Sequence, residues 1–143
     1  MSARGQRNSG FTLIEIMVVV AILGILAAIV VPRVMDRPDQ ARVAKAEQDI
    51  RALEGALNLY RLDNYVYPST EQGLEALVEE PSGNPPAPNW SGYLDRMPRD
   101  PWGRPYQYLN PGQHGAIDIY SLGADGQPGG DGINAEIGNW DID

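Results

Sequence analysis

The chain has 143 residues, enough for one small domain plus an N-terminal segment. It contains no cysteine, which excludes disulfides, thiol nucleophiles and thiolate metal sites. Its formal net charge of −8 argues against nucleic acid as a partner, because nucleic-acid affinity comes largely from Lys and Arg on phosphates.

The N-terminal segment combines a basic leader with a long apolar run. Residues 16–31 read IMVVVAILGILAAIVV, and Phe11 to Ile14 extend this run to about the 20 residues that cross a bilayer as a helix. Arg4 and Arg7 precede it, and positive charge tends to stay in the cytoplasm. We therefore expect a single span with a cytoplasmic amino terminus and a C-terminal body on the outer side of the membrane.

The position of a processing site distinguishes two kinds of leader. A cleaved secretory signal needs small residues of the A-x-A kind after the apolar run, whereas Ala27 and Ala28 are followed here by IVVP. The other candidate lies before the run, between Gly10 and Phe11. Cleavage there removes only the basic leader and keeps the apolar segment.

Glu15 is the only charged residue within the apolar segment. An ionised carboxylate in hydrocarbon costs roughly 2.5 kcal/mol or more, so we expect this residue to have a partner or a function.

The stretch GFTLIEIMVVVAILGILAAIVVP resembles the class III signal of type IV pilins and type II secretion pseudopilins. The matching residues are Gly10, Phe11, Glu15 and Pro32. The resemblance implies that a prepilin peptidase cuts after Gly10 and methylates the new amino terminus at Phe11. It also implies that Glu15 pairs with the amino terminus of a neighbouring subunit in a filament. The alternative is a plain signal anchor with a stray acid.

A one-sided apolar stripe follows the proline. Val43, Ala46, Ile50, Leu53, Leu57 and Tyr60 recur at alternating intervals of three and four, which predicts an amphipathic helix. We expect one helix from about Thr12 to Leu62, whose second half packs its stripe on a small head. A coiled-coil partner is the alternative for the stripe. Pro32 is expected to kink or loosen the helix, and Asp36 or Arg37 to restart it near Pro38.

The rest of the chain predicts a turn-rich head. Ser69 or Thr70 is positioned to cap a short helix that Pro81 ends. PYQYL and AIDIYSL favour short antiparallel strands joined by the turn NPGQHG.

DPWGRPYQY and the closing SLGADGQPGGDGINAEIGNWD resemble the major pseudopilins of type II secretion, and the resemblance is thinnest at residues 81–89. Type IV pilins commonly close this region with a disulfide, which this chain lacks. The resemblance implies an α+β, type IV pilin-like fold: a long N-terminal helix, membrane-spanning in its first half, on a head with a short helix and a small antiparallel sheet. The expected parts are a cleaved leader (1–10), a transmembrane or filament-core helix (11–33) and a periplasmic domain (34–143).

The glycine-rich loop carries Asp125, Asp131 and Glu136, and calcium prefers such oxygen ligands. The spacing does not fit an EF-hand, so a solvated turn is the alternative on composition alone. The resemblance implies a structural calcium ion here. Asp125 and the Leu122 carbonyl match the family's ligands. Asp131 matches less well, because relatives often place the second acid near this position or one residue later, which here is Gly132. Asn134 and backbone groups are expected to complete the ligand shell.

No catalytic constellation is recognisable, and the single histidine, His114, is expected in an exposed turn, so we predict that the chain is not an enzyme. The resemblance implies a major structural subunit of a pseudopilus that supports protein export. Its expected partners are further copies of itself, minor pseudopilins, prepilin peptidase and the assembly platform of the bacterial inner membrane. The assembled filament is expected in the periplasm. The alternative is a minor pseudopilin or a type IV pilin subunit.

Overall fold

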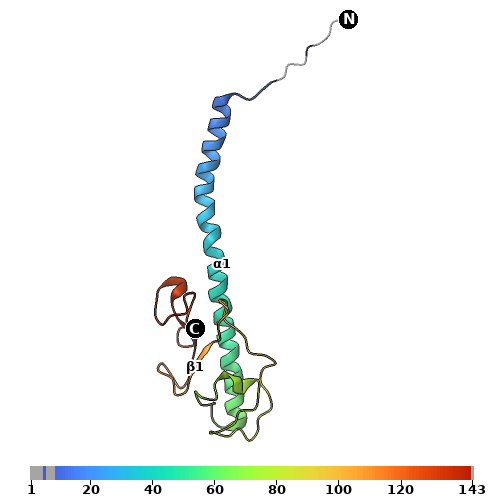
Figure 1. Ribbon diagram of the computed structural model, residues 1–143, viewed down its shortest axis with the longest axis vertical. Helices are drawn as coiled ribbons and strands as arrows, with labels where there is room; N and C mark the ends of the chain where they lie inside the picture. Colours follow the sequence, from blue (N-terminus) through green and yellow to red (C-terminus); the bar gives the residue numbers. More distant parts are fainter. Residues whose placement is uncertain (1–4, 6–8, 143) are drawn as a thin grey trace. The chain divides into compact units, whose positions relative to one another are not determined.

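The computed structural model describes Gly5 and residues 9–142, and the side chains of residues 30–36 lie outside this description. Most of the predicted leader, residues 1–10, therefore lies outside the described residues. The elements in chain order are α1 (Leu13–Asn64), the 3₁₀ helix η1 (Leu74–Leu77), β1 (Gln107–Leu109), β2 (Asp118–Ser121), the 3₁₀ helix η2 (Gly132–Asn134) and β3 (Ile137–Gly138) (Figure 1). The chain divides into two compact units, Met1–Pro38 and Asp39–Asp143.

Helix α1 begins after Thr12, whose hydroxyl oxygen accepts a hydrogen bond from the Glu15 amide at 3.2 Å. Its backbone stays helical through both Pro32 and Pro38. The prediction that a helix restarts at Asp36 or Arg37 is therefore wrong. A proline removes one donor and crowds one carbonyl, and a helix of 52 residues retains many hydrogen bonds on either side.

The first unit exposes its apolar side chains. Every large apolar residue from Phe11 to Ile29 is between 50% and 80% exposed. Within the part of the chain that the structure describes, no helix combines the length and the apolarity that crossing a membrane requires.

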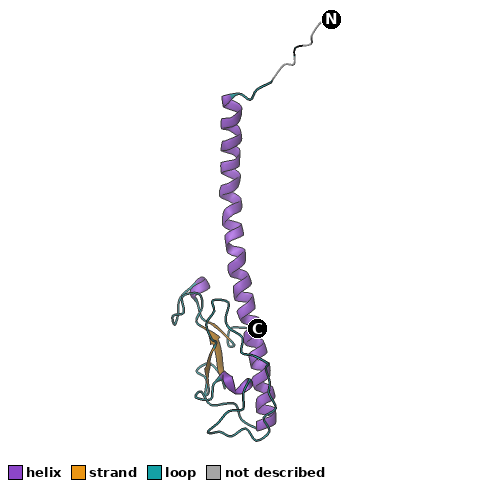
Figure 2. Ribbon diagram, turned by 45° about the vertical axis from the view of Figure 1, so that its right-hand side comes forward, coloured by secondary structure: helices purple, strands orange, loops and turns teal. Residues whose placement is uncertain are grey.

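The second unit has a closed core built on the predicted stripe of α1. The stripe is confirmed as core from its second residue onward, because these five residues are all fully buried: Ala46, Ile50, Leu53, Leu57 and Tyr60. Val43, the first residue of the predicted stripe, is only partly buried. Figure 2 shows the short strands beside this part of α1. Tyr106, directly before β1, connects the sheet to α1. It is buried, and its hydroxyl donates to the Asp49 carboxylate of α1 at 2.7 Å. Burial, and to a smaller extent the nearby Asp49 carboxylate, raises the pKa of Tyr106. The hydroxyl therefore stays protonated and remains a donor.

The sheet is antiparallel in the order β1-β2-β3. Tyr108 pairs with Ile119 between β1 and β2, and Tyr120 pairs with Gly138 between β2 and β3. The two predicted strands are confirmed, and the turn between them is the predicted NPGQHG.

The predicted second helix is only partly correct. Ser69 caps as expected, since its hydroxyl accepts from the Gln72 amide at 3.1 Å while the Gln72 side chain accepts from the Ser69 amide at 3.0 Å. This reciprocal pair is a capping box. The chain then reaches Gly73 with a φ of 66°, which no α-helix allows, and continues as the 3₁₀ helix η1.

Candidate functional site

Two candidate sites were predicted from the sequence, and the first is the amino-terminal segment. Gly10 and Phe11 lie just before α1 outside any helix, and both are exposed. A side chain added at Gly10 would meet no described atom within 4 Å. The backbone between these two residues is therefore open to a processing enzyme. Pro32 lies in the helical backbone of α1, and its side chain lies outside the described residues.

Glu15 occupies the first turn of α1, three residues after the capping Thr12. A negative charge at this position is stabilising, because the free amides at a helix amino terminus give it a partial positive charge. The sequence predicted a partner in another subunit or a stray acid, and it did not identify this local role. The T-x-x-E spacing of a capping box was the signal that could have revealed it.

The second candidate site is the glycine-rich loop between β2 and β3, residues 122–136. Its two limbs are held together by a hydrogen bond from the Ala124 amide to the Ile133 carbonyl at 2.8 Å. This bond brings the limb that contains Leu122 and Asp125 beside the limb that contains Asn134. Asp131 lies just before η2, and the Asn134 amide donates to its carbonyl at 3.1 Å. All four predicted ligand residues therefore belong to one folded loop.

Glycine is required where the limbs approach each other. A Cβ at Gly123 would lie 2.7 Å from the Ala135 carbonyl oxygen, and one at Gly130 would lie 2.6 Å from the Asn134 carbonyl oxygen. Both glycines also have a positive φ. The loop is thus a tight backbone cradle that side chains would fill.

The donors around this cradle are oxygens, the ligands that a hard cation such as calcium prefers. Asp125, Asp131 and Asn134 are exposed. The Asp125 carboxylate accepts from the Gln127 amide at 3.0 Å, and Glu136 accepts from the Gly129 amide at 3.3 Å. Among the described residues, no three carboxylate, histidine or cysteine side chains gather closely enough to form a metal cluster. The chemistry and the cradle fit calcium, with backbone carbonyls needed to complete the shell.

His114 lies in the turn between β1 and β2, and it is exposed as predicted. Its ring stacks on Trp140 at 3.8 Å, and its Nδ1 atom lies 3.0 Å from the buried Asp118 carboxylate. Burial acts to raise the pKa of Asp118, but hydrogen bonds from the His114 ring and from the Gln113 and His114 amides together lower it. The residues that line the adjacent pocket include no serine, threonine or cysteine. The His114 ring therefore connects the turn to Asp118 of β2 and to Trp140 of the C-terminal segment.

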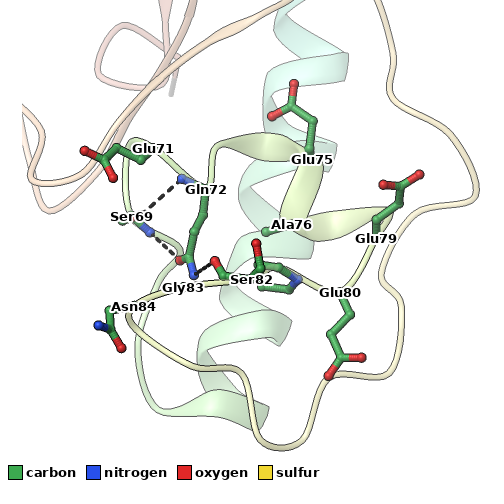
Figure 3. A pocket seen from close by; sticks show the side chains of 11 residues that line it. Ser69, Glu71, Gln72, Glu75, Ala76, Glu79, Glu80, Ser82, Gly83 and Asn84 are labelled. Carbon is green, nitrogen blue, oxygen red and sulfur yellow. Dashed lines mark hydrogen bonds between the residues drawn. The ribbon is translucent and has the colours of Figure 1, made fainter.

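An acidic pocket of about 310 Å³ lies beside η1, formed by residues 69–84. Gln72 braces it by donating to the Ser82 and Pro85 carbonyls at 3.2 and 2.9 Å. Figure 3 shows the side chains of Glu71, Glu75, Glu79 and Glu80 around it, and they point in different directions. Because the carboxylates do not converge, this pocket is a solvated surface rather than a metal site.

Comparisons with known proteins bear on both candidate sites. A family model described as "Type II secretion system (T2SS), protein G" matches residues 33–140, and the prokaryotic N-terminal methylation motif matches residues 5–31. The second match contains the Gly10–Phe11 bond and Glu15.

The similarity to individual relatives extends over almost the whole chain. Type II secretion system core protein G from Pseudomonas aeruginosa is 64% identical over 138 residues, which is 95% of this chain and 97% of the relative. The protein of the same name from Vibrio cholerae is 57% identical over 139 residues, 96% of this chain and 94% of the relative. The crystal structure of the major pseudopilin of enterohaemorrhagic Escherichia coli matches with a TM-score of 0.68 and 50% identity, over 78% of this chain and 96% of that one. The chain therefore belongs to the protein G family of the type II secretion system and has the type IV pilin-like fold of a pseudopilin.

Proposed function

We propose that this chain is the major structural subunit of a type II secretion pseudopilus and that its role is structural rather than enzymatic. The observation that supports this most directly is the contrast between its two units. The second unit closes its own core, whereas the first leaves every large apolar side chain from Phe11 to Ile29 at least half exposed. Contiguous apolar surface of this size needs a covering partner. Lipid covers it before assembly, and the helices of other copies cover it in the filament.

Proteolytic processing prepares the lipid-covered subunit for assembly into the filament. Prepilin peptidase cuts the exposed bond after Gly10 and methylates the amino group of Phe11. The chain is then held in the bacterial inner membrane by a single span, with its head in the periplasm. From there it joins a homopolymer with the help of minor pseudopilins and the inner-membrane assembly platform.

Glu15 has two roles in this proposal. Within one chain it lies in the first turn of α1, where its backbone amide donates to the capping hydroxyl of Thr12. Between chains its carboxylate pairs with the positive amino terminus at Phe11 of a neighbouring copy. A charge pair of this kind, removed from water, fixes register as well as attraction.

We propose that the glycine-rich loop binds one structural calcium ion. Asp125, Asp131, Asn134 and the Leu122 carbonyl provide ligands, and further loop carbonyls complete the shell. The ion orders a segment that has little apolar core: Asp131, Ile133 and Asn134 are all exposed. Its role is to stabilise the head.

The amino terminus of the membrane-extracted protein tests the central proposal. Mass spectrometry of the chain produced with its secretion system is expected to find N-methylated Phe11, and an intact Met1 would contradict pseudopilin processing.

Glu15→Gln and Thr12→Ala separate the two roles of Glu15. Glu15→Gln keeps the backbone amide that donates to Thr12 but loses the charge, whereas Thr12→Ala removes the capping hydroxyl and keeps the charge. If charge pairing drives assembly, electron microscopy will show far fewer filaments for Glu15→Gln than for Thr12→Ala. Normal filaments from Glu15→Gln would refute the pairing.

A further inference from the structure

The turn DPWGR, residues 100–104, is organised by one buried carboxylate. Asp100 is 4% exposed. Its Oδ1 atom accepts from the Arg104 amide at 2.8 Å and from the Trp102 amide at 3.1 Å. The Asp100 amide donates to the Arg104 carbonyl at 2.8 Å and closes the turn. These hydrogen bonds fix the backbone from which the Arg104 side chain extends.

The same carboxylate connects this turn to the start of the glycine-rich loop. Its Oδ2 atom accepts from the hydroxyl of the fully buried Ser121 at 2.9 Å. That hydroxyl accepts in turn from the Gly123 amide at 3.2 Å. A buried chain of hydrogen bonds thus runs from Asp100 to the first glycine of the loop.

The Arg104 guanidinium then holds the next residues of the loop. Its Nη1 atom donates to the Gly123 carbonyl at 3.0 Å, and both Nη1 and Nη2 lie 3.3 Å from the Ala124 carbonyl. The Gly126 amide donates to the Gly123 carbonyl at 3.3 Å, which closes a turn around Asp125. A Cβ at Gly126 would lie 2.6 Å from the guanidinium carbon, so this side chain lies directly against the turn.

We propose that Arg104 is a positioning residue for the calcium site: its guanidinium is a resident cation that orders residues 123–126, and with them Asp125, before any metal binds. This inference rests on the proposed calcium site. A metal ion then needs to order only the limb that contains Asp131 and Asn134. Pre-ordering one limb lowers the entropy cost of binding. The guanidinium contacts are made to the Gly123 and Ala124 carbonyls, so the Asp125 carboxylate remains available to a metal.

Two effects of Arg104 on metal binding oppose each other. Its positive charge repels a bound cation, but Asp125 and Asn134 are exposed, and water and salt screen charges at the surface. Its hydrogen bonds to the Gly123 and Ala124 carbonyls fix the backbone next to the ligand Asp125. Removing an outer partner that orients a metal ligand typically lowers metal affinity about 10–100-fold. We therefore expect the ordering effect to exceed the repulsion.

The test uses the full-length chain in detergent with Arg104→Met, Arg104→Lys and Arg96→Met. Arg96 is exposed and makes none of these loop contacts, so Arg96→Met removes the same charge elsewhere in the head. Hydrogen exchange in EGTA reports the order of residues 123–126 without metal. Titration with Ca²⁺ reports affinity.

In EGTA, Arg104→Met is expected to exchange these loop amides at least about tenfold faster than the parent, while the core amides of α1 and Arg96→Met remain unchanged. Calcium affinity is expected to fall about tenfold in Arg104→Met and to recover partly in Arg104→Lys. Unchanged loop exchange, or calcium binding as tight as in the parent, would overturn the inference. If the parent binds no calcium, the calcium site fails, and the exchange measurement alone decides whether Arg104 orders the loop.

Discussion

Two tyrosines in the core of the head have opposite hydrogen-bond states, and this difference predicts opposite effects of the same substitution. Tyr60 is fully buried, and its hydroxyl is the one buried side-chain polar atom without a partner among the described residues. Tyr108 is 8% exposed, and its hydroxyl donates to the Pro68 carbonyl at 2.8 Å. We compare Tyr60→Phe with Tyr108→Phe, which remove the same atom from the same core.

The expected magnitudes follow from these contacts. A buried polar group without a partner costs about 1–3 kcal/mol, so Tyr60→Phe is expected to stabilise the head by about 1 kcal/mol after the lost packing of one oxygen. Tyr108→Phe loses a hydrogen bond with a net value of about 0.5–1.5 kcal/mol. The Pro68 carbonyl keeps a second donor, the Asn110 side chain at 2.8 Å, so no larger penalty is added. The two variants should therefore differ by about 2 kcal/mol in the free energy of unfolding.

Urea unfolding of the full-length chain in detergent, followed by tryptophan fluorescence, measures this difference. Equal slopes against urea would show that the substitutions changed stability and left the unfolded state unaltered. A Tyr60→Phe variant less stable than the parent would refute the reasoning, because it would mean that the hydroxyl has a favourable partner.

Three further predictions concern the turns of the head. The pKa of Asp118 is lowered in the folded state, so the ionised carboxylate stabilises the fold. This stabilisation is present above about pH 4 and is lost as the pH falls through the pKa of the folded state. Asp118→Asn should be less stable at neutral pH but show a shallower loss of unfolding free energy below pH 5, and equal slopes would contradict this. Gly130→Ala should open the loop more than Gly129→Ala. Both glycines have a positive φ, but only Gly130 lies against the Asn134 carbonyl. Faster hydrogen exchange at residues 123–135 in Gly130→Ala than in Gly129→Ala would confirm this difference. EGTA should lower the melting temperature of the calcium-loaded chain. A ligand at a hundredfold excess over its dissociation constant stabilises the folded state by about 2.7 kcal/mol. An unchanged melting temperature would count against a bound calcium ion.

The features predicted correctly from the sequence are those set by local spacing. The stripe of α1 repeats every three or four residues, so Ile50, Leu53 and Leu57 share one face whatever they pack against. The strands β1 and β2 follow from alternation and from the turn between them. The sequence predicted a cap at Ser69 or Thr70, and the structure selects Ser69, whose partner Gln72 is three residues away. Gly73 ended that helix early, since its positive φ depends on the surrounding fold rather than on the local pattern.

The contacts that were missed join residues far apart in the sequence. Asp100 and Ser121 are separated by 21 residues, and Arg104 reaches Gly123 across 19. Nothing in the spacing of either segment indicates the other. The pairing of Glu15 with another subunit stays a prediction, whereas the cap that Thr12 forms beside it is a local contact within the first turn of α1.

The DPWG turn gains a role from these contacts that its composition alone does not indicate. Aspartate is short enough for one of its oxygens to accept two amides of its own turn while the other accepts from Ser121. Gly103 supplies the φ of 85° that returns the chain to Arg104. One buried carboxylate therefore determines both the shape of this turn and the position of the loop that starts at Gly123. Because the same residues fix both segments, a change at Asp100 should disturb the glycine-rich loop, while the buried face of α1, which has its own apolar contacts, should keep its structure.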